Sequence, residues 1–211
     1  MRLQAARPSD LLVDTDEILD AAKAAALRAT GIKGVFRYLG DVSAAEAATI
    51  LGAGLVLFFV NHSRAYGWIP SAAEGAADGA RDVQRLQKLG VPKGVHAFFD
   101  LEGVGGGDPR AVIAHVNAWA AAVKAAGYIA GLYVGEQTLL TSDQLFALPD
   151  VHLYWHSASR VTDASGKEAG PACGWAIFQG NPVDVVVAGV VVDYDSVYED
   201  HFGRLPIGVA A

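Results

Sequence analysis

Cysteine is almost absent from this sequence, because Cys173 is the only one among 211 residues. A single cysteine cannot form an internal disulfide, and it excludes a metal site built from several thiolates. No histidine or basic motif stands beside Cys173, so we interpret this thiol as inert. Basic residues are also in the minority, with 16 Lys and Arg against 23 Asp and Glu and a net charge of −7. Nucleic acids and anionic membranes select basic patches, so neither is expected as a partner.

Long apolar runs are missing as well. No stretch is long and apolar enough to predict a membrane span. The opening residues, MRLQAARPSD, lack the apolar segment of a secretory signal. We therefore expect synthesis in the cytoplasm without a signal peptide, and action at a cell wall only after export or release. A nucleotide-binding GxGxxG is missing too, since GVGGG at 103–107 lacks the spacing, and no cofactor is expected.

The sequence does contain a large apolar fraction, 52% of its residues, divided into short runs. These runs predict eight strands, at 11–16, 34–39, 55–61, 94–102, 128–134, 151–157, 174–179 and 187–194. Helical patterns separate the first five strands, at 17–30, 43–54, 71–89 and 109–126, and a short helix is predicted at 141–148. Ser43, followed by Glu46, predicts a capping box at the start of the second helix.

Alternating strands and helices indicate an α/β protein with a mostly parallel sheet, and eight is the number of strands that closes a barrel. We predict a single (β/α)8 TIM-like barrel, distorted, with helices reduced in its second half. The expected domain is 1–211, with its core at about 10–200. An open doubly wound sheet is the alternative.

Pairs of carboxylates stand two residues apart where three of the predicted strands end: Asp14 and Asp16, Asp100 and Glu102, Asp193 and Asp195. Any one such pair is more often a helix cap or a solvated loop charge. The carboxyl ends of barrel strands converge on one face, however, so three pairs together favour one shared acidic site. Like charges that close raise the pKa of at least one carboxyl group, which supplies a proton donor near neutral pH.

Aromatic residues follow the same strand ends. Tyr38, Tyr133, Trp155 and Trp68 offer flat apolar faces with polar edges, which suit sugar rings, although rings at strand ends also fill cores. Histidines support no metal site. His152 and His156 have an H-x3-H spacing, but on a strand this separates them by about 13 Å, too far for one ion.

The order of these motifs resembles the lysozyme-type muramidases of glycoside hydrolase family 25. It is still more similar to the related glycoside-hydrolase-like barrel domains of unknown function from bacteria and phages. The resemblance covers about residues 10–200 and rests on VDTD, FRYLG, KLGVPKGVHAFFDLEG, GLYVG, LYWHSA, WAIFQG and VVVDYD. Val13 departs from the glycine usual in muramidases, and Glu102 from the second aspartate frequent in the closer domains.

The resemblance implies roles for individual residues. Glu102 would be the general acid that protonates the leaving oxygen. Asp100 would stabilise the positively charged sugar or orient an acetamido group. Substrate contacts would come from the other acids, from Gln179 at the end of the WAIFQ strand and from the aromatic residues: Asp14, Asp193, Asp195, Gln179, Tyr38, Tyr133, Trp155 and Trp68.

These observations predict a glycosidase that uses carboxylate acid–base chemistry. The predicted substrate is the glycan of peptidoglycan. One alternative is a non-catalytic carbohydrate-binding or phage structural barrel that keeps the cleft. A second is a metal-dependent hydrolase or deacetylase, disfavoured because no well-spaced histidine set accompanies the acids. The stereochemistry of cleavage stays open, because alternate strand residues are roughly 6.6 Å apart at the backbone, between the retaining and inverting distances.

Overall fold

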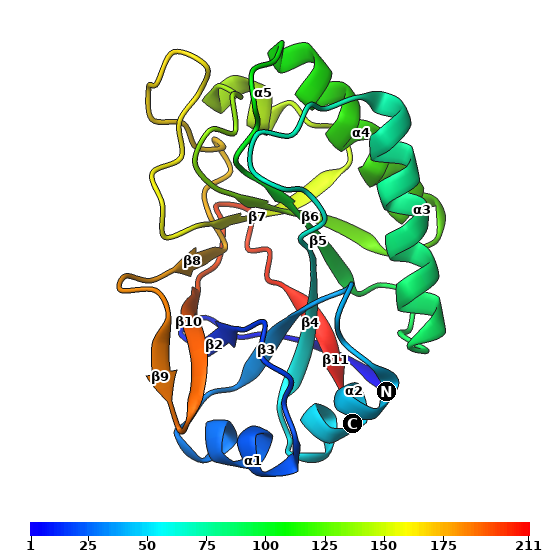
Figure 1. Cartoon of the computed structure of the whole chain (residues 1–211), viewed down its shortest axis with the longest axis vertical. Coiled ribbons are helices and arrows are strands. Elements are labelled where there is room, and N and C mark those ends of the chain that lie inside the picture. Colours follow the sequence, from blue (N-terminus) through cyan, green and yellow to red (C-terminus); the bar gives the residue numbers. More distant parts are fainter.

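Eight strands close into a ring in the computed structural model, which describes residues 1–211 (Figure 1). The strands of the ring are β2 (Leu11–Asp14), β3 (Gly34–Tyr38), β4 (Val56–Asn61), β5 (His96–Leu101), β6 (Ile129–Val134), β7 (Val151–His156), β8 (Ile177–Gln179) and β10 (Val190–Val197). They follow this order around the ring, β10 pairs with β2, and β4 pairs with β5. The predicted distorted TIM-like barrel is confirmed.

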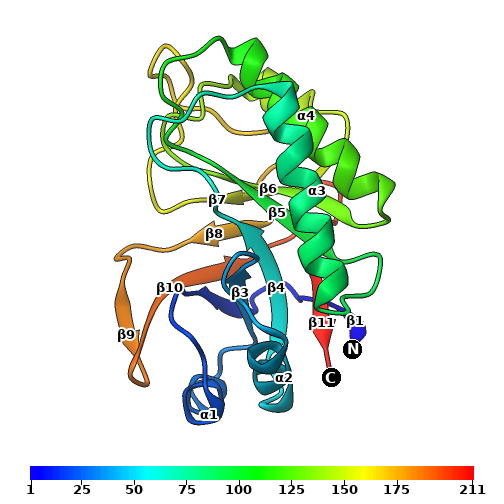
Figure 2. The same ribbon diagram turned by 45° about the vertical axis from the view of Figure 1, so that its right-hand side comes forward.

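Helices follow the first five barrel strands and then stop. They are α1 (Ala21–Ala29), α2 (Ala44–Gly52), α3 (Ala72–Lys88), α4 (Pro109–Ala125) and the single-turn α5 (Ser142–Phe146). Figure 2 shows α3 and α4 side by side along one flank of the barrel. Asp108 caps α4, whose first residue is proline. Because no helix follows β7, β8 or β10, the predicted reduction of helices in the second half of the barrel is confirmed.

The predicted capping box at α2 forms only in half. Ser43 Oγ accepts the hydrogen bond from the Glu46 amide at 3.1 Å. The Glu46 carboxylate instead lies 2.9 Å from Arg37 Nε on β3, and it accepts a second hydrogen bond from the Leu19 amide. Arg37 is fully buried, so its charge requires a nearby anion more strongly than the helix end does.

The direction of the last barrel strand corrects the sequence prediction of a parallel-type barrel. β10 is antiparallel to both of its neighbours, β2 and β8. It follows β9 (Val185–Val187) through a tight turn at Ala188 and Gly189, both with positive φ. A parallel return would need a crossover of a dozen or more residues, and none is available between β8 and β10. Asp193 therefore lies within its strand, directly opposite Asp14, and not at a carboxyl end.

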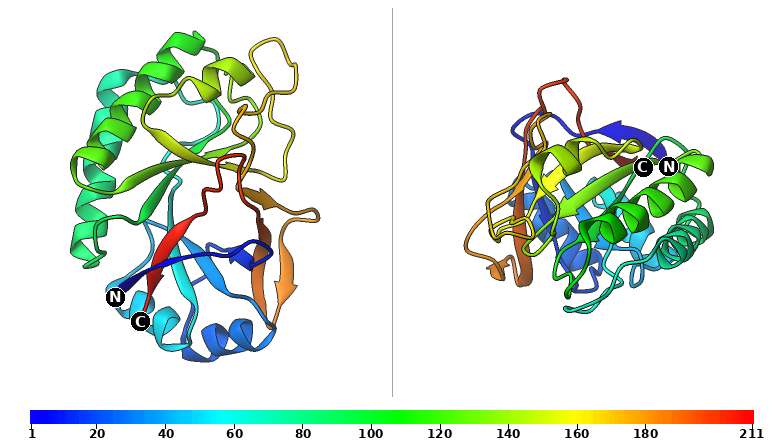
Figure 3. Two further views of the ribbon diagram at one scale, coloured as in Figure 1. Left: turned by 180° about the vertical axis from the view of Figure 1, so that it is seen from behind. Right: turned by 90° about the horizontal axis from the view of Figure 1, so that it is seen from above.

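Three strands were not predicted from the sequence: β9, β1 (Arg2–Ala5) and β11 (Ile207–Ala210). β1 and β11 pair antiparallel, which brings the two chain termini together (Figure 3). Val209 of β11 pairs with Leu57 of β4, and β4 begins to pair with β5 two residues later, at Phe59. Gly208 permits this approach, because a Cβ atom there would lie 2.5 Å from the Leu57 carbonyl oxygen.

The barrel interior is filled by aromatic side chains. Phe36 stacks on Phe58 with ring centroids 4.9 Å apart and on Trp155 at 4.2 Å, and Phe98 meets Phe36 edge-on. These are alternate residues of their strands, whereas the intervening residues pack outward against the helices. Burial of each such ring contributes about 1.5–3 kcal/mol. The layer forms a floor beneath the carboxyl ends of the parallel strands.

None of the five helices combines the length and the apolar character that a membrane crossing requires.

Candidate active site

A pocket of about 150 Å³ opens above the aromatic layer, at the carboxyl ends of the parallel strands. It is lined by Asp14, Tyr38, Val60, His62, Asp100, Glu102, Tyr133, Trp155, Gln179 and Asp193. Eight of the ten residues predicted for the site are in this set. A second hollow of about 140 Å³ shares Asp14, Tyr38 and Asp193 with the pocket and extends to Asp16. Together the two hollows form a short acidic groove across the barrel mouth.

Asp100 and Glu102 form the wall at the end of β5. Asp100 is the last inward-facing residue of the strand and only 8% exposed. Its Oδ2 accepts a hydrogen bond from His62 Nδ1, while its Oδ1 has no partner. Burial raises the pKa of Asp100, and the hydrogen bond from His62 opposes that shift. The same hydrogen bond raises the pKa of His62, so each partner favours the charged form of the other.

Glu102 has a different environment. Burial, and then the nearby charge of Asp100, raises its pKa to about 7. No hydrogen bond to the Glu102 carboxyl group offsets this. With a pKa of about 7, Glu102 keeps a proton that it can donate near neutral pH, whereas Asp100 has a hydrogen-bond donor that favours its ionised form.

Gln179 organises the opposite wall. Its Nε2 donates to Asp14 Oδ2 at 2.8 Å and to Asp193 Oδ2 at 3.1 Å. Its Oε1 accepts from the Tyr133 hydroxyl at 3.0 Å and from a backbone amide. Tyr38 adds a longer hydrogen bond to Asp14 at 3.3 Å. Despite these donors, burial raises the pKa of Asp14 to about 7. Antiparallel pairing of β10 is what places Asp193 beside Asp14 here.

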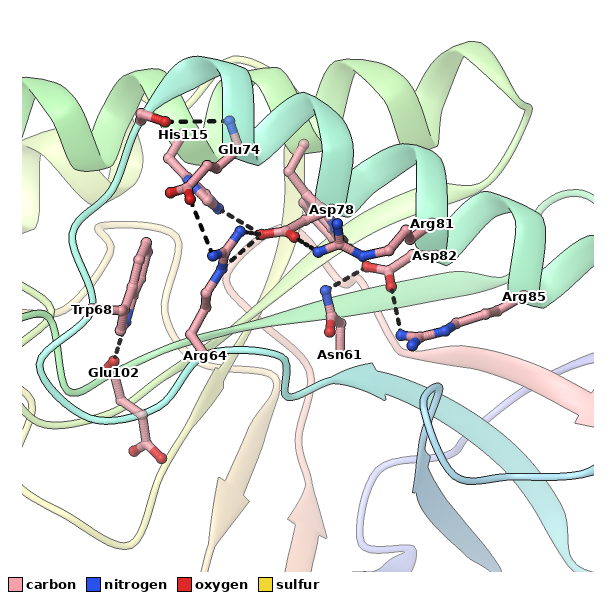
Figure 4. Close-up of polar contacts among 12 residues, drawn as sticks. Asn61, Arg64, Trp68, Glu74, Asp78, Arg81, Asp82, Arg85, Glu102 and His115 are labelled. Atoms are coloured by element: carbon pink, nitrogen blue, oxygen red, sulfur yellow. Dashed lines mark hydrogen bonds and ion pairs between the residues drawn. The ribbon is translucent and has the colours of Figure 1, made fainter.

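Two predicted site residues lie outside the pocket. Asp195 is fully buried on β10, and neither of its oxygens has a hydrogen-bond partner. Burial, and then the charge of Asp14, raises the pKa of Asp195 well above its ordinary value. Trp68 is 8% exposed and does not line the pocket, because its indole Nε1 donates to the backbone carbonyl of Glu102 at 2.9 Å (Figure 4).

Two features of the site were not assigned from sequence. His62 is one of them, because its bond to Asp100 joins residues 38 positions apart and follows no local pattern. Gly135, just after β6, is the other: a Cβ atom there would overlap Glu102 Oε2 and lie 2.7 Å from Glu102 Cβ. No local pattern marks a glycine that makes room for a side chain from another strand.

One set of side chains has the composition of a metal site. Ligand atoms of His62, Asp100 and Glu102 all lie within 4.8 Å of one another. His152 and His156 do not share a site: His152 approaches His96 at 3.4 Å, whereas His156 packs against Trp175.

Comparison with known proteins identifies the family. The family model described as "Rv2525c-like, glycoside hydrolase-like domain" matches residues 25–183. The chain belongs to this family. No curated protein sequence matches it significantly.

Solved structures show the same fold as this glycoside-hydrolase-like chain. The Tat-secreted protein Rv2525c of Mycobacterium tuberculosis, solved with L-tartrate, is 17% identical with a TM-score of 0.67, covering 92% of this chain and 98% of that one. The catalytic domain of endolysin Ply40, from bacteriophage P40 of Listeria monocytogenes, is 17% identical with a TM-score of 0.60, covering 92% and 95%. The autolysin LytC of Streptococcus pneumoniae, solved with a synthetic peptidoglycan ligand, is 15% identical with a TM-score of 0.63, covering 90% of this chain and 47% of that one.

Proposed function

We propose that this protein is a glycoside hydrolase that cleaves the glycan of bacterial peptidoglycan, with Glu102 as its general acid. The observation that carries the proposal is the unequal environment of two neighbouring carboxyl groups. The His62 imidazole donates a hydrogen bond to Asp100, and this bond favours the ionised form of Asp100 against the effect of burial. Glu102 has no such partner, and its pKa of about 7 keeps a proton available near neutral pH. One acid to donate a proton and one anion to stabilise positive charge is the division that glycoside hydrolysis needs.

In this mechanism Glu102 protonates the oxygen of the leaving sugar as the glycosidic bond breaks. The ring that remains develops positive charge, and the Asp100 carboxylate stabilises it or orients its acetamido group for attack. Asp14, Asp193 and Gln179 face the same space from the other wall and offer acceptors and an amide to the sugar hydroxyls. Water then attacks the anomeric carbon and displaces the carboxylate or acetamido oxygen that had closed on it, while Glu102 accepts the proton of that water.

The spacing of the acids favours retention of configuration. Oxygen atoms of Asp100 and Glu102 approach within 4.8 Å. Inverting enzymes hold their carboxyl groups roughly 6.5–9.5 Å apart to admit a water between them, and retaining enzymes about 5–5.5 Å. This short separation favours the retaining route, in which the intermediate forms on the face of the sugar opposite the leaving group and water then enters on the face that the leaving group vacated.

Two observations support a peptidoglycan substrate: the proteins that share this fold and the residues that line the groove. Related barrels include a phage endolysin catalytic domain and an autolysin solved with a synthetic peptidoglycan ligand. Tyr38 and Tyr133 are half-buried in the pocket wall and offer apolar surface to the C–H faces of sugar rings, whereas Trp155 is buried beneath them. The groove is acidic, which suits the positively charged transition state of glycoside cleavage.

The test is hydrolysis of purified peptidoglycan and of chitin oligomers, followed by mass spectrometry of the products. Glu102→Gln keeps the shape of the side chain but removes its proton, and it should lower turnover by about 10²–10⁴-fold. Glu199→Gln, at an exposed glutamate, is the matched control. Activity that survives Glu102→Gln would refute the mechanism. Binding of oligosaccharides without cleavage would indicate a carbohydrate-binding barrel. Activity lost on chelation with EDTA would indicate a metal-dependent hydrolase at His62, Asp100 and Glu102.

A further inference from the structure

Helix α3 carries two buried aspartates, one turn apart, that the proposed reaction does not use. Asp78 and Asp82 are both fully buried. Asp82 accepts hydrogen bonds from Asn61 Nδ2 at 2.7 Å and from Trp119 Nε1 at 2.8 Å. Asn61 is the last residue of β4 and immediately precedes His62 in the pocket. Asp82 therefore ties α3 to the strand end that supports one side of the site.

Asp78 anchors the loop that follows β4. It accepts two hydrogen bonds from Arg64, from Nε at 2.9 Å and from Nη2 at 2.5 Å, and a further one from Arg81. His115 of α4 adds its Nε2 at 3.3 Å from the same carboxylate. Figure 4 shows Arg64 reaching across from the loop to α3 to make this ion pair. Because the carboxylate is wholly buried, the position of Arg64 is tightly defined.

Trp68 lies beyond this ion pair, in the same loop. The Arg64 guanidinium lies over the indole at 5.9 Å, and the ring meets His115 edge-on at 4.9 Å and Phe99 at 6.1 Å. The indole Nε1 then donates to the Glu102 carbonyl at 2.9 Å. Backbone hydrogen bonds from Gly67 to Gly103 and from Gly105 to Trp68 join the two loops, at 2.7 Å and 2.9 Å.

The far side of Glu102 is closed by the loop after β6. The Gly135 amide donates to the Leu101 carbonyl at 3.0 Å, and the Gly103 amide donates to the Glu136 carbonyl at 2.9 Å. The backbone around Glu102 is thus held from both sides. The Trp68 side is the one that a buried ion pair secures.

We propose that Trp68, secured by the Arg64–Asp78 ion pair, is a positioning residue that fixes the backbone of Glu102 and so holds its carboxyl group beside Asp100. This inference rests on the proposed function for its catalytic consequence, but the placement of Glu102 can be measured without activity. It replaces the direct sugar contact expected of Trp68 with an indirect role through Glu102.

Trp68→Phe is the informative variant, because it keeps an aromatic ring against Phe99 and His115 but removes the indole N–H. The Glu102 carboxyl group should relax toward solvent, so its pKa, followed by carbon-13 NMR of labelled protein, should fall toward the ordinary glutamate value. If wild type cleaves glycan, turnover should fall by about 10–100-fold with little change in KM, as expected for a misplacement near 1 Å. The basic limb of the pH–rate profile should move to lower pH. Trp175→Phe, at a half-buried tryptophan that packs on His156, should change none of these quantities.

The outcomes separate the two proposals. A folded Trp68→Phe protein whose Glu102 titrates as in wild type would overturn the positioning role, even if its melting temperature falls. A shifted Glu102 titration in a protein that cleaves no glycan would support the positioning role and refute the proposed function. Loss of the Arg64–Asp78 pair is not the first test, because a buried charge left unpaired costs about 3–5 kcal/mol and threatens folding.

Discussion

Gly135→Ala should damage both stability and activity by adding one methyl group. The new Cβ atom would overlap Glu102 Oε2 and lie 2.7 Å from Glu102 Cβ and 3.0 Å from Cδ. Rotation of the carboxylate relieves only the first contact, since the second involves the root of the side chain. The backbone of Glu102 cannot retreat easily, because Trp68 holds its carbonyl oxygen. Gly135 does not have a positive φ, so alanine is permitted there by backbone conformation alone.

The magnitude follows from two opposing effects. Overpacking of this kind costs about 1–3 kcal/mol. Replacing glycine by alanine at a permitted conformation stabilises by about 0.4–1 kcal/mol through the unfolded state. The net loss of unfolding free energy is therefore up to about 2.5 kcal/mol. Displacement of the Glu102 carboxyl group by about 1 Å should lower turnover by roughly 100-fold.

Chemical unfolding and glycan hydrolysis would measure the two effects. Gly52→Ala is the control, because a Cβ atom there meets nothing within 4 Å and alanine favours the helix end. Combining Gly135→Ala with Glu102→Gly removes the three atoms nearest to the new Cβ, so in that background the alanine should stabilise instead of destabilise. The steric reasoning would be refuted if Gly135→Ala alone were as stable and active as Gly52→Ala.

Three further predictions concern charge in the groove. Folding raises the pKa of Glu102 from 4.5 to about 7. The contribution of this group to folding stability is therefore fully present below pH 4.5 and is lost as pH rises through 7. The melting temperature should depend less on pH in Glu102→Gln than in wild type across this range. His62→Gln replaces the imidazole whose charged form favours ionised Asp100 with a neutral amide, so the acidic limb of the pH–rate profile should move to higher pH, and an unchanged limb would contradict this role. Gln179→Leu leaves Asp14 without its main donor, so unfolding free energy at pH 8 should fall by about 1–3 kcal/mol.

Local sequence patterns were sufficient for the parallel part of the barrel. Alternation between apolar runs and helical patterns predicted the strands from β2 to β7 and the helices between them, because each element is short and carries its own period and caps. The absence of helices after β7 could be predicted as well, because the segments there carry no helical pattern. Asp100 and Glu102 could also be found locally, since charged residues at the end of a buried strand require a partner or a use.

Pairing between distant segments could not be read in this way. A strand pattern has a period but no direction, so nothing in VVVDYD revealed that β10 runs antiparallel. Strands β1 and β11 lie outside the predicted core because each finds its partner about 200 residues away. The short β9 strand pairs only with β10. Their stability comes from tertiary contacts and not from propensity.

The site shows the same division in single residues. Residue type and strand position were enough to predict most of the residues that line the pocket, since alternate residues of barrel strands face the interior. Only tertiary structure decided that Trp68 turns toward the Glu102 backbone, that Asp195 is buried below the groove, and that His62 and Gly135 complete the surroundings of the two acids. Each of these depends on the distance between atoms of separate loops, a quantity set by how the barrel closes and not by any local period.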